Sequence, residues 1–253
     1  MKFRSLLLLA GCFLIASCTS KDQIKKALVE DPSILADAIQ AHPVEFFEAL
    51  NKASQDAKDK QEKESISKLF DAPLTPNLRS DESIRGNKDA PIVLVEYSDF
   101  ECPYCSRGAQ VVKQLRSKYG DKIQFIYKHL PLPFHKQAMI SAQYYEAIRL
   151  QSPEKAFEFH DKIFENQALL QKGPSELEKI AKSFSIDMAK LKKDLNSEKV
   201  KSRIEEDMSE AQKFGIQGTP GFVINGIPVK GAYPLDHFES ILTELQKRGS
   251  LKI

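Results

Sequence analysis

The sequence contains no tryptophan, and it is poor in glycine and cysteine, with 11 and 4 of its 253 residues. After the first 18 residues it also has no apolar stretch long enough to cross a membrane as a helix, which argues against a bundle of membrane-spanning helices. The remaining composition, 42% hydrophobic and 28% charged, is ordinary for a globular protein. A chain of this length can build one sizeable core and a smaller appendage.

The first 18 residues are the exception, because they have the pattern of an export signal: a basic start and a short apolar run. They end in Leu-Ile-Ala-Ser-Cys18, which resembles a bacterial lipobox, whose cysteine becomes a lipid-bearing N-terminus. We therefore predict lipidation at Cys18 and an exported protein, periplasmic or in the cell envelope, held at a membrane by lipid. Two alternatives are lipidation at Cys12, which leaves too short an apolar run before it, and cleavage without lipidation.

An excess of charge of one sign is also absent. Removal of the export signal takes away Lys2 and Arg4 and leaves 35 basic and 35 acidic side chains. The formal net charge of the remaining chain is then near zero, so nothing in the composition indicates a nucleic-acid partner.

Cysteine usage narrows the chemistry further, because only Cys102 and Cys105 remain outside the export signal. In an oxidising compartment such a pair is either a structural bridge or a redox centre. A Cys102–Cys105 disulfide would close a very small loop and stabilise the fold little, which favours the redox centre. Half of a zinc site is the competing interpretation, but a structural zinc needs four ligands and the sequence has no second cysteine pair. We expect no metal.

The chain divides into several regions after the export signal. Residues 19–70 have a helical pattern, with helix starts expected at Asp31-Pro32 and His42-Pro43. This segment is too small to bury its own apolar side chains, so we expect residues 21–70 to associate with another copy of the chain. The alternative is a stalk that only holds the rest of the protein away from the membrane. Residues 71–90 are polar and rich in proline, as in a linker.

Residues 91–253 have the pattern of an α/β domain. An apolar strand is predicted at 92–97, a helix after Cys105 that ends near Gly120, and a second strand at 123–127, which together indicate a parallel βαβ unit. Residues 134–214 are predicted to be almost wholly helical. A hairpin with an Asn225-Gly226 turn and a last helix over 234–248 complete the domain.

The segment Cys102-Pro103-Tyr104-Cys105 lies at the predicted junction of strand and helix. A helix N-terminus stabilises a thiolate, which is the attacking species in disulfide exchange. Proline is accepted at this place because its missing N–H would have no helical partner. We expect Cys102 to attack and Cys105 to resolve the mixed disulfide.

Two further elements belong to the predicted site. Gly218-Thr219-Pro220-Gly221 precedes a strand, where Pro220 can adopt the cis form and the Thr219 backbone can pair with an extended substrate. Glu96 lies inside an otherwise apolar strand. If it is buried, it can relay a proton near Cys105. The alternative is that Glu96 points to solvent at the end of the strand.

Together these residues resemble the DsbA-like branch of the thioredoxin superfamily over about residues 75–250. The resemblance rests on Cys-Pro-Tyr-Cys after Val-Glu-Tyr-Ser-Asp-Phe-Glu, on Lys128-His129-Leu130-Pro131-Leu132, on the run from Gly218 to Gly226, and on the long helical stretch between them. It implies an α/β thioredoxin fold with a helical insertion at about 134–214, preceded by an N-terminal helical segment. It also implies no cofactor.

The resemblance further assigns roles. Cys102 matches the nucleophile, Cys105 the resolving cysteine, Pro220 the cis-proline and Glu96 the buried acid, while Tyr104 stands where the strongest oxidases have histidine. With Pro103 and Thr219, Tyr104 is expected to contact substrate.

The expected function is formation or shuffling of disulfides in unfolded or misoxidised exported proteins, with a membrane redox partner that resets the cysteine pair. The sequence leaves oxidase and isomerase open. The alternatives are a non-enzymatic surface lipoprotein or holdase and, third, a metal-handling dithiol.

Overall fold

The computed structural model describes residues 20–253, so the predicted export signal and lipidation at Cys18 lie outside the described residues. The chain divides into two compact units, Met1–Glu62 and Lys63–Ile253. Within residues 20–253, no helix has the length and hydrophobicity required to cross a bilayer.

The elements in chain order are α1 (Lys21–Glu30), α2 (Ser33–Ala41), α3 (Pro43–Asp71), β1 (Ile84–Gly86), β2 (Ile92–Ser98), α4 (Pro103–Tyr119), η1 (Gly120–Lys122), β3 (Ile123–His129), α5 (Ala138–Arg149), α6 (Pro153–Glu165), η2 (Gln167–Lys172), α7 (Pro174–Lys182), α8 (Met188–Asp194), α9 (Glu198–Lys213), β4 (Gly221–Ile224), β5 (Ile227–Lys230) and α10 (Leu235–Lys247).

Two of the N-terminal helices begin at the predicted prolines, since Pro32 directly precedes α2 and Pro43 is the first residue of α3. Ser20 caps α1 in a capping box with Gln23. No residue of α1 or α2 is buried. Their apolar side chains are therefore exposed in the single chain.

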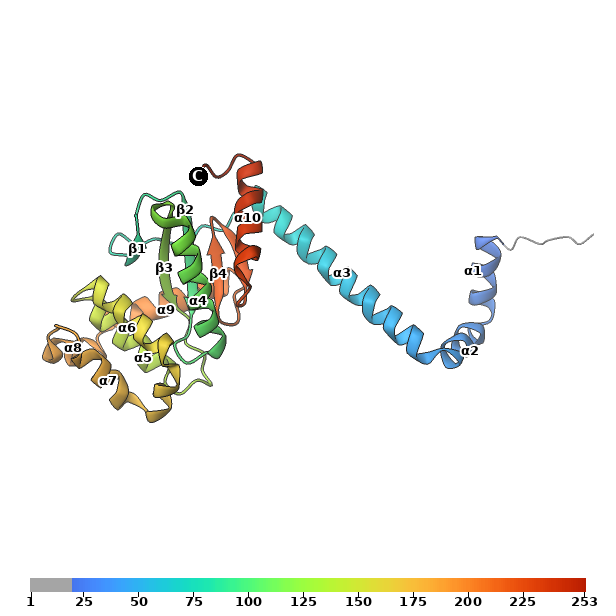
Figure 1. The fold of residues 1–253 in the computed structure, drawn as a ribbon. Helices are drawn as coiled ribbons and strands as arrows, with labels where there is room; N and C mark the ends of the chain where they lie inside the picture. The colour runs from blue at the N-terminus through green and yellow to red at the C-terminus, as the bar shows by residue number, and fades with distance from the viewer. Residues whose placement is uncertain (1–19) are drawn as a thin grey trace, which may run out of the picture. The chain divides into compact units, whose positions relative to one another are not determined.

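The second unit is built on a five-stranded sheet with the order β1-β3-β2-β4-β5. β2 and β3 are parallel and α4 connects them, so the predicted βαβ unit is confirmed. β4 and β5 form the predicted antiparallel hairpin, in which Asn225 and Gly226 both have positive φ, as a two-residue turn requires. The helices α5 to α9 follow β3 and form the predicted insertion (Figure 1).

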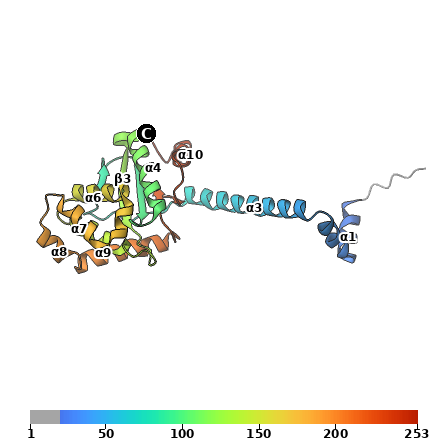
Figure 2. The ribbon, with the colours of Figure 1, turned by 60° about the horizontal axis from the view of Figure 1, so that its bottom comes forward.

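The two faces of the sheet are covered by different helices. Leu94 and Phe125 share a core with Val112 and Leu115 of α4 and Phe238 of α10. On the other face Val95, Tyr97 and Val223 pack with Ala211 of α9. Figure 2 gives a second view of α4 and α10 beside the sheet. Because side chains alternate along a strand, Glu96 follows Leu94 onto the α4 face.

The predicted linker over 71–90 is wrong in one part, because Ile84–Gly86 forms the edge strand β1, antiparallel to β3. This strand has three residues, too few for an alternating pattern to be recognised in the sequence. Its extended conformation depends on its pairing with β3, which lies about forty residues later in the sequence.

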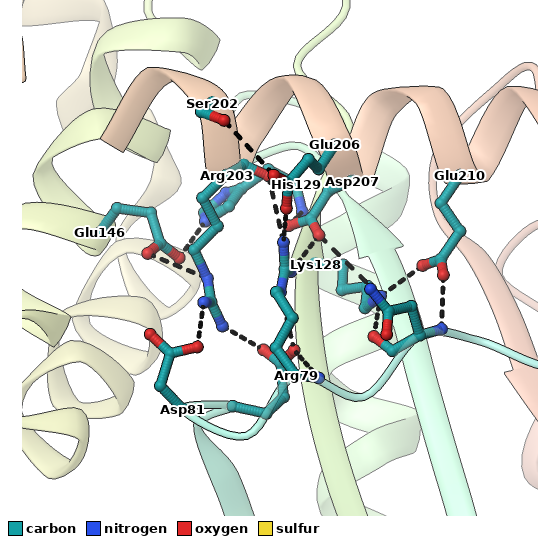
Figure 3. A network of polar contacts seen from close by, with 12 residues as sticks. Arg79, Asp81, Lys128, His129, Glu146, Ser202, Arg203, Glu206, Asp207 and Glu210 are labelled. Carbon is teal, nitrogen blue, oxygen red and sulfur yellow. Dashed lines mark hydrogen bonds and ion pairs between the residues drawn. The ribbon is translucent and has the colours of Figure 1, made fainter. Parts of the chain in front are cut away.

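The chain just before β1 is held to α9 by a buried ionic network (Figure 3). Arg79 bonds to Asp207 and to Glu82, and Lys128 to Glu210. Arg203 contacts Asp81 at 2.8 Å and Glu82 at 2.6 Å, and Glu146 lies 3.3 Å from its Nε. Burial alone would raise the pKa of Glu146, but the hydrogen bond from His129 and the charges of His129, Arg149 and Arg203 lower it to about 2.

Removal of Arg203 should therefore destabilise the second unit. In Arg203→Ala the carboxylates of Glu82 and Glu146 lose a buried partner, and we expect a loss of about 3–5 kcal/mol in the free energy of unfolding, measured in urea. Arg248→Ala is the matched control, because this partly exposed arginine forms ion pairs with Glu244 and Asp71 near the surface and lies over the Phe70 ring, and its loss should cost about 1 kcal/mol. Equal costs for the two variants would contradict the prediction.

Candidate active site

The two thiols lie at the N-terminus of α4, directly after β2. Cys102 is the N-cap residue and Pro103 the first helical residue, as predicted. Both cysteines are free thiols and both are buried, with exposed fractions of 4% for Cys102 and 0% for Cys105. The structure therefore shows the reduced pair, and the Cys102–Cys105 disulfide stays a prediction.

The pKa values of the two thiols are shifted in opposite directions. Hydrogen bonding from the Cys105 thiol, aided by the backbone N–H groups of Cys105 and Tyr104, outweighs burial and lowers the pKa of Cys102 to about 5. Burial raises the pKa of Cys105, and its hydrogen bond to Cys102 and the nearby charge of Glu96 raise it further. One thiolate is thus stabilised at Cys102 while Cys105 keeps its proton.

The loop before β4 faces the sulfurs. The Thr219–Pro220 peptide bond is cis. The Cys102 sulfur lies 3.4 Å from the Thr219 carbonyl oxygen, within the hydrogen-bond distance for sulfur. The predicted loop and the predicted cysteine pair, more than a hundred residues apart in the sequence, therefore meet at one place.

Glu96 is fully buried, which decides between the two alternatives left by the sequence. Ser98 donates a 2.7 Å hydrogen bond to its Oε1. Burial raises the pKa of Glu96 to about 8 in spite of this hydrogen bond, and the nearby Cys102 charge adds to the rise. A carboxyl group with this pKa can both hold and release a proton near neutral pH.

A glycine permits the close packing around this carboxyl group. A Cβ on Gly108 of α4 would lie 3.1 Å from the Phe222 ring, 3.2 Å from Pro220 and 3.5 Å from Glu96 Oε1. On the other face of the sheet, a Cβ on Gly221 would lie 2.3 Å from Ile216. The backbone of α4 therefore approaches the cis-proline loop more closely than a side chain would permit. Gly108 was not recognised from the sequence, because a helical glycine has no distinct signal there.

Asp99, three residues before Cys102, is a buried carboxylate that is 1% exposed. It accepts hydrogen bonds from the backbone N–H groups of Glu101 and Leu132, and it contacts His135 Nδ1 at 2.7 Å. Asp99 thus fixes the loop after β3 beside the thiols. His129 is the last residue of β3.

The helical insertion also reaches the site. Gln167 of η2 donates hydrogen bonds of 2.8 and 2.7 Å to the carbonyl oxygens of Phe100 and Cys102. Only the fold brings this glutamine to the cysteine turn, so no sequence signal could have identified it. Pro103 and Tyr104 are exposed at the surface of the site, and the Arg107 guanidinium lies over the Tyr104 ring.

Paired thiols at a strand-to-helix junction, opposite a cis-proline loop, define the class of thioredoxin-fold dithiol proteins. A family model described as Thioredoxin matches residues 79–244. The chain therefore belongs to the thioredoxin family.

Solved structures agree with the predicted DsbA-like resemblance. BdbD from Bacillus subtilis, in its oxidised form, is 26% identical, with a TM-score of 0.60, over 69% of this chain and 97% of that one. The thiol-disulfide exchange protein alpha-DsbA2 from Wolbachia pipientis shares the fold at 23% identity and a TM-score of 0.59, over 75% of this chain and 98% of that one. The likeness to DsbA-like proteins and the predicted fold class are confirmed.

Curated relatives match by sequence over a shorter region. The Na⁺/H⁺ antiporter NhaA 1 from Mycolicibacterium vanbaalenii is 34% identical over 155 residues, which are 60% of this chain and 24% of the relative. The chain thus spans about a quarter of the length of the antiporter it matches.

The opposite acidities of the two thiols give a direct prediction. Titration of the reduced protein, followed by the ultraviolet absorbance of the thiolate, should show a midpoint near pH 5, the lowered pKa of Cys102. Cys102→Ser should remove this transition. Cys105→Ala should shift it upwards, because the variant lacks the thiol that donates the largest stabilising hydrogen bond to the Cys102 sulfur. A midpoint near about 8.5, the value of an ordinary cysteine, would show that the site does not stabilise the thiolate.

Proposed function

We propose that the chain is a dithiol–disulfide oxidoreductase that forms or shuffles disulfide bonds in exported proteins. The observation that carries this proposal is the meeting of two free thiols at the N-terminus of α4 with the cis-proline loop, where the Cys102 sulfur lies 3.4 Å from the Thr219 carbonyl oxygen. General thiol–disulfide exchange is also supported by the family and by the DsbA-like structural neighbours.

In the reductive direction, the Cys102 thiolate attacks one sulfur of a substrate disulfide. A mixed disulfide forms and the other substrate sulfur leaves as a thiolate. Cys105 then passes its proton to Glu96 and attacks the Cys102 sulfur. This step forms the Cys102–Cys105 disulfide and releases the second substrate thiolate, so the substrate gains two electrons and the protein loses two. The oxidative direction is the reverse.

Substrate would bind around the exposed Pro103 and Tyr104, with the Thr219 backbone pairing with an extended segment. The carbonyl of Thr219 already contacts the Cys102 sulfur, so a strand bound there would pass directly over the nucleophile. Pro220 would shape this edge. An oxidase must keep its cysteine pair oxidised, whereas an isomerase must keep it reduced. In either case a membrane redox partner would reset the pair. The reduction potential of the Cys102–Cys105 pair would distinguish the two activities.

We also infer that the protein is exported and lipid-anchored through Cys18. Support comes only from the sequence of residues 1–18, with its basic start, short apolar run and lipobox-like end. Thiol chemistry of this kind suits an oxidising compartment.

Residues 21–70 are proposed to join copies of the chain. Large apolar side chains are exposed along all three helices, among them Phe47 at 65% and Leu50 at 68% exposed. These exposed apolar side chains are distributed over α1, α2 and the first half of α3, whereas the second half of α3 is mostly charged. Burial of these side chains against the same surface of another copy would remove the exposed apolar area from water.

The exchange reaction can be tested with the purified protein and a disulfide-bonded peptide. We expect the wild type to exchange, Cys102→Ser to lose all exchange, and Cys105→Ser to accumulate the mixed disulfide because its resolving thiol is absent. Arg248→Ala, at the end of α10 and outside the site, is the control and should exchange at the wild-type rate. If Cys102→Ser shows no exchange but keeps unfolded proteins from aggregating as well as the wild type does, the protein is instead a non-enzymatic holdase.

The proposed association can be tested by the mass of the protein in solution. Light scattering should show an oligomer for the wild type and a monomer for Phe47→Glu with Leu50→Glu, because a charge at each position would have to be desolvated at the interface. Lys58→Glu in the charged half of α3 should leave the mass unchanged. A monomeric wild type would support the stalk alternative.

A further inference from the structure

A layer of buried polar side chains lies beneath the thiols, on the α4 face of the sheet. Within the described residues, several of its atoms are buried and have no hydrogen-bond partner: Glu96 Oε2, Tyr127 Oη, His129 Nδ1, Tyr145 Oη and His160 Nε2. An unpaired buried polar atom is costly, and its usual partner in a polar interior is an ordered water molecule. So many in one layer need a functional explanation.

These side chains are contiguous. Glu96 of β2 and Tyr127 of β3 are register partners in the parallel pair, and register partners point to the same face of the sheet. The Tyr127 ring lies 4.8 Å from the His160 ring, centroid to centroid. The layer thus continues from the carboxyl group beside Cys105 through a phenol to an imidazole.

The far end of this layer reaches the surface. His160 Nδ1 lies 2.8 Å from Asp161 Oδ1, and the Asp161 side chain is 45% exposed. Both residues line a cavity of about 120 Å³ between α4 and α6, together with Arg85, Val112, Arg116 and Phe164. Glu96 itself is fully buried, so it needs a route by which its proton reaches water.

We propose that Tyr127 and His160, with water bound between their unpaired polar atoms, form a proton relay from Glu96 to solvent at the Asp161 cavity. The relay rests on the proposed exchange reaction, whose Cys105 proton it carries away. The proton would then not have to leave through the surface around Cys102, which bound substrate covers.

The proton balance of the relay is simple. Cys105 gives its proton to the Glu96 carboxylate as its thiolate attacks the Cys102 sulfur. Glu96 then returns to the carboxylate when its proton passes through the proposed water molecules and the Tyr127 hydroxyl to His160 Nε2. His160 releases the proton on its Nδ1 towards Asp161 and solvent. Tyr127 stays neutral, because it accepts one proton as it gives up another.

The charges around the relay favour rapid release. Burial lowers the pKa of His160, although Asp161 opposes this, so an imidazolium formed there would give up a proton readily. Burial, with the nearby Glu96 and Cys105, keeps the pKa of Tyr127 well above its usual value. The titratable and charged groups that face the relay are Arg85, Asp99, Cys102, Cys105, Lys113, Arg116, His129, Tyr145, Glu146, Asp161 and Glu165.

The relay can be tested on the step that closes the Cys102–Cys105 disulfide. Reduced full-length protein is mixed with glutathione disulfide, quenched with acid at successive times, and its mixed and internal disulfides are separated. For the wild type, the closing rate should rise with pH with a midpoint near 8, the pKa of Glu96. Tyr127→Phe removes only the hydroxyl group and should slow closure by about tenfold, a modest proton-transfer effect.

Two controls separate a relay from a structural role. Tyr145→Phe removes another unpaired hydroxyl from the same layer, off the path, and should close at the wild-type rate. Neither variant should move the pH midpoint of the Cys102 thiolate. In His160→Ala, added imidazole should restore the closing rate, whereas it should not accelerate the wild type.

The failures are distinguishable. If the wild type forms no mixed disulfide with glutathione, the proposed exchange function fails. If the mixed disulfide forms and Tyr127→Phe closes at the rate of Tyr145→Phe at every pH, exchange stands and the relay is overturned.

Discussion

The site is governed by the cost of placing negative charge in a poorly hydrated interior. Cys102, Cys105 and Glu96 are three acids at one end of the sheet, and like charges so close together and so far from water cannot all form. The helix N-terminus and the hydrogen bonds of the cysteine turn stabilise one anion, at Cys102. With that anion at Cys102, Cys105 and Glu96 titrate as a coupled pair, and a second negative charge on either of them is costly. Cys105 must therefore pass its proton to Glu96 as its sulfur attacks.

The fold around these acids serves this arrangement. The parallel register of β2 and β3 puts Glu96 beneath the helix that carries the thiols, and Gly108 lets that helix approach the cis-proline loop closely. Asp99 holds the loop after β3, while Gln167 of the insertion holds the carbonyl oxygens of the cysteine turn. The helical insertion is thus part of the site's support as well as of the core.

Prediction from the sequence succeeded where one local pattern determines the structure. The apolar run over β2, the Asn225-Gly226 turn and the proline at the start of α4 each have a strong local signal. It failed where tertiary contacts decide, as for the short strand β1, the burial of Asp99 and the reach of Gln167. For Glu96 the sequence left burial open, since a strand residue faces the core or the solvent according to how the sheet is covered.

The ionic network before β1 has a mechanical consequence. A pull on the N-terminal side of the Lys63–Ile253 unit would enter it through the chain before β1, where the Leu74 N–H is bonded to the Gly226 carbonyl and Arg79 is paired with Asp207. Next in line is the antiparallel pairing of β1 with β3. The force would thus be spread over α9 and the sheet edge before it could distort the turn that holds Cys102.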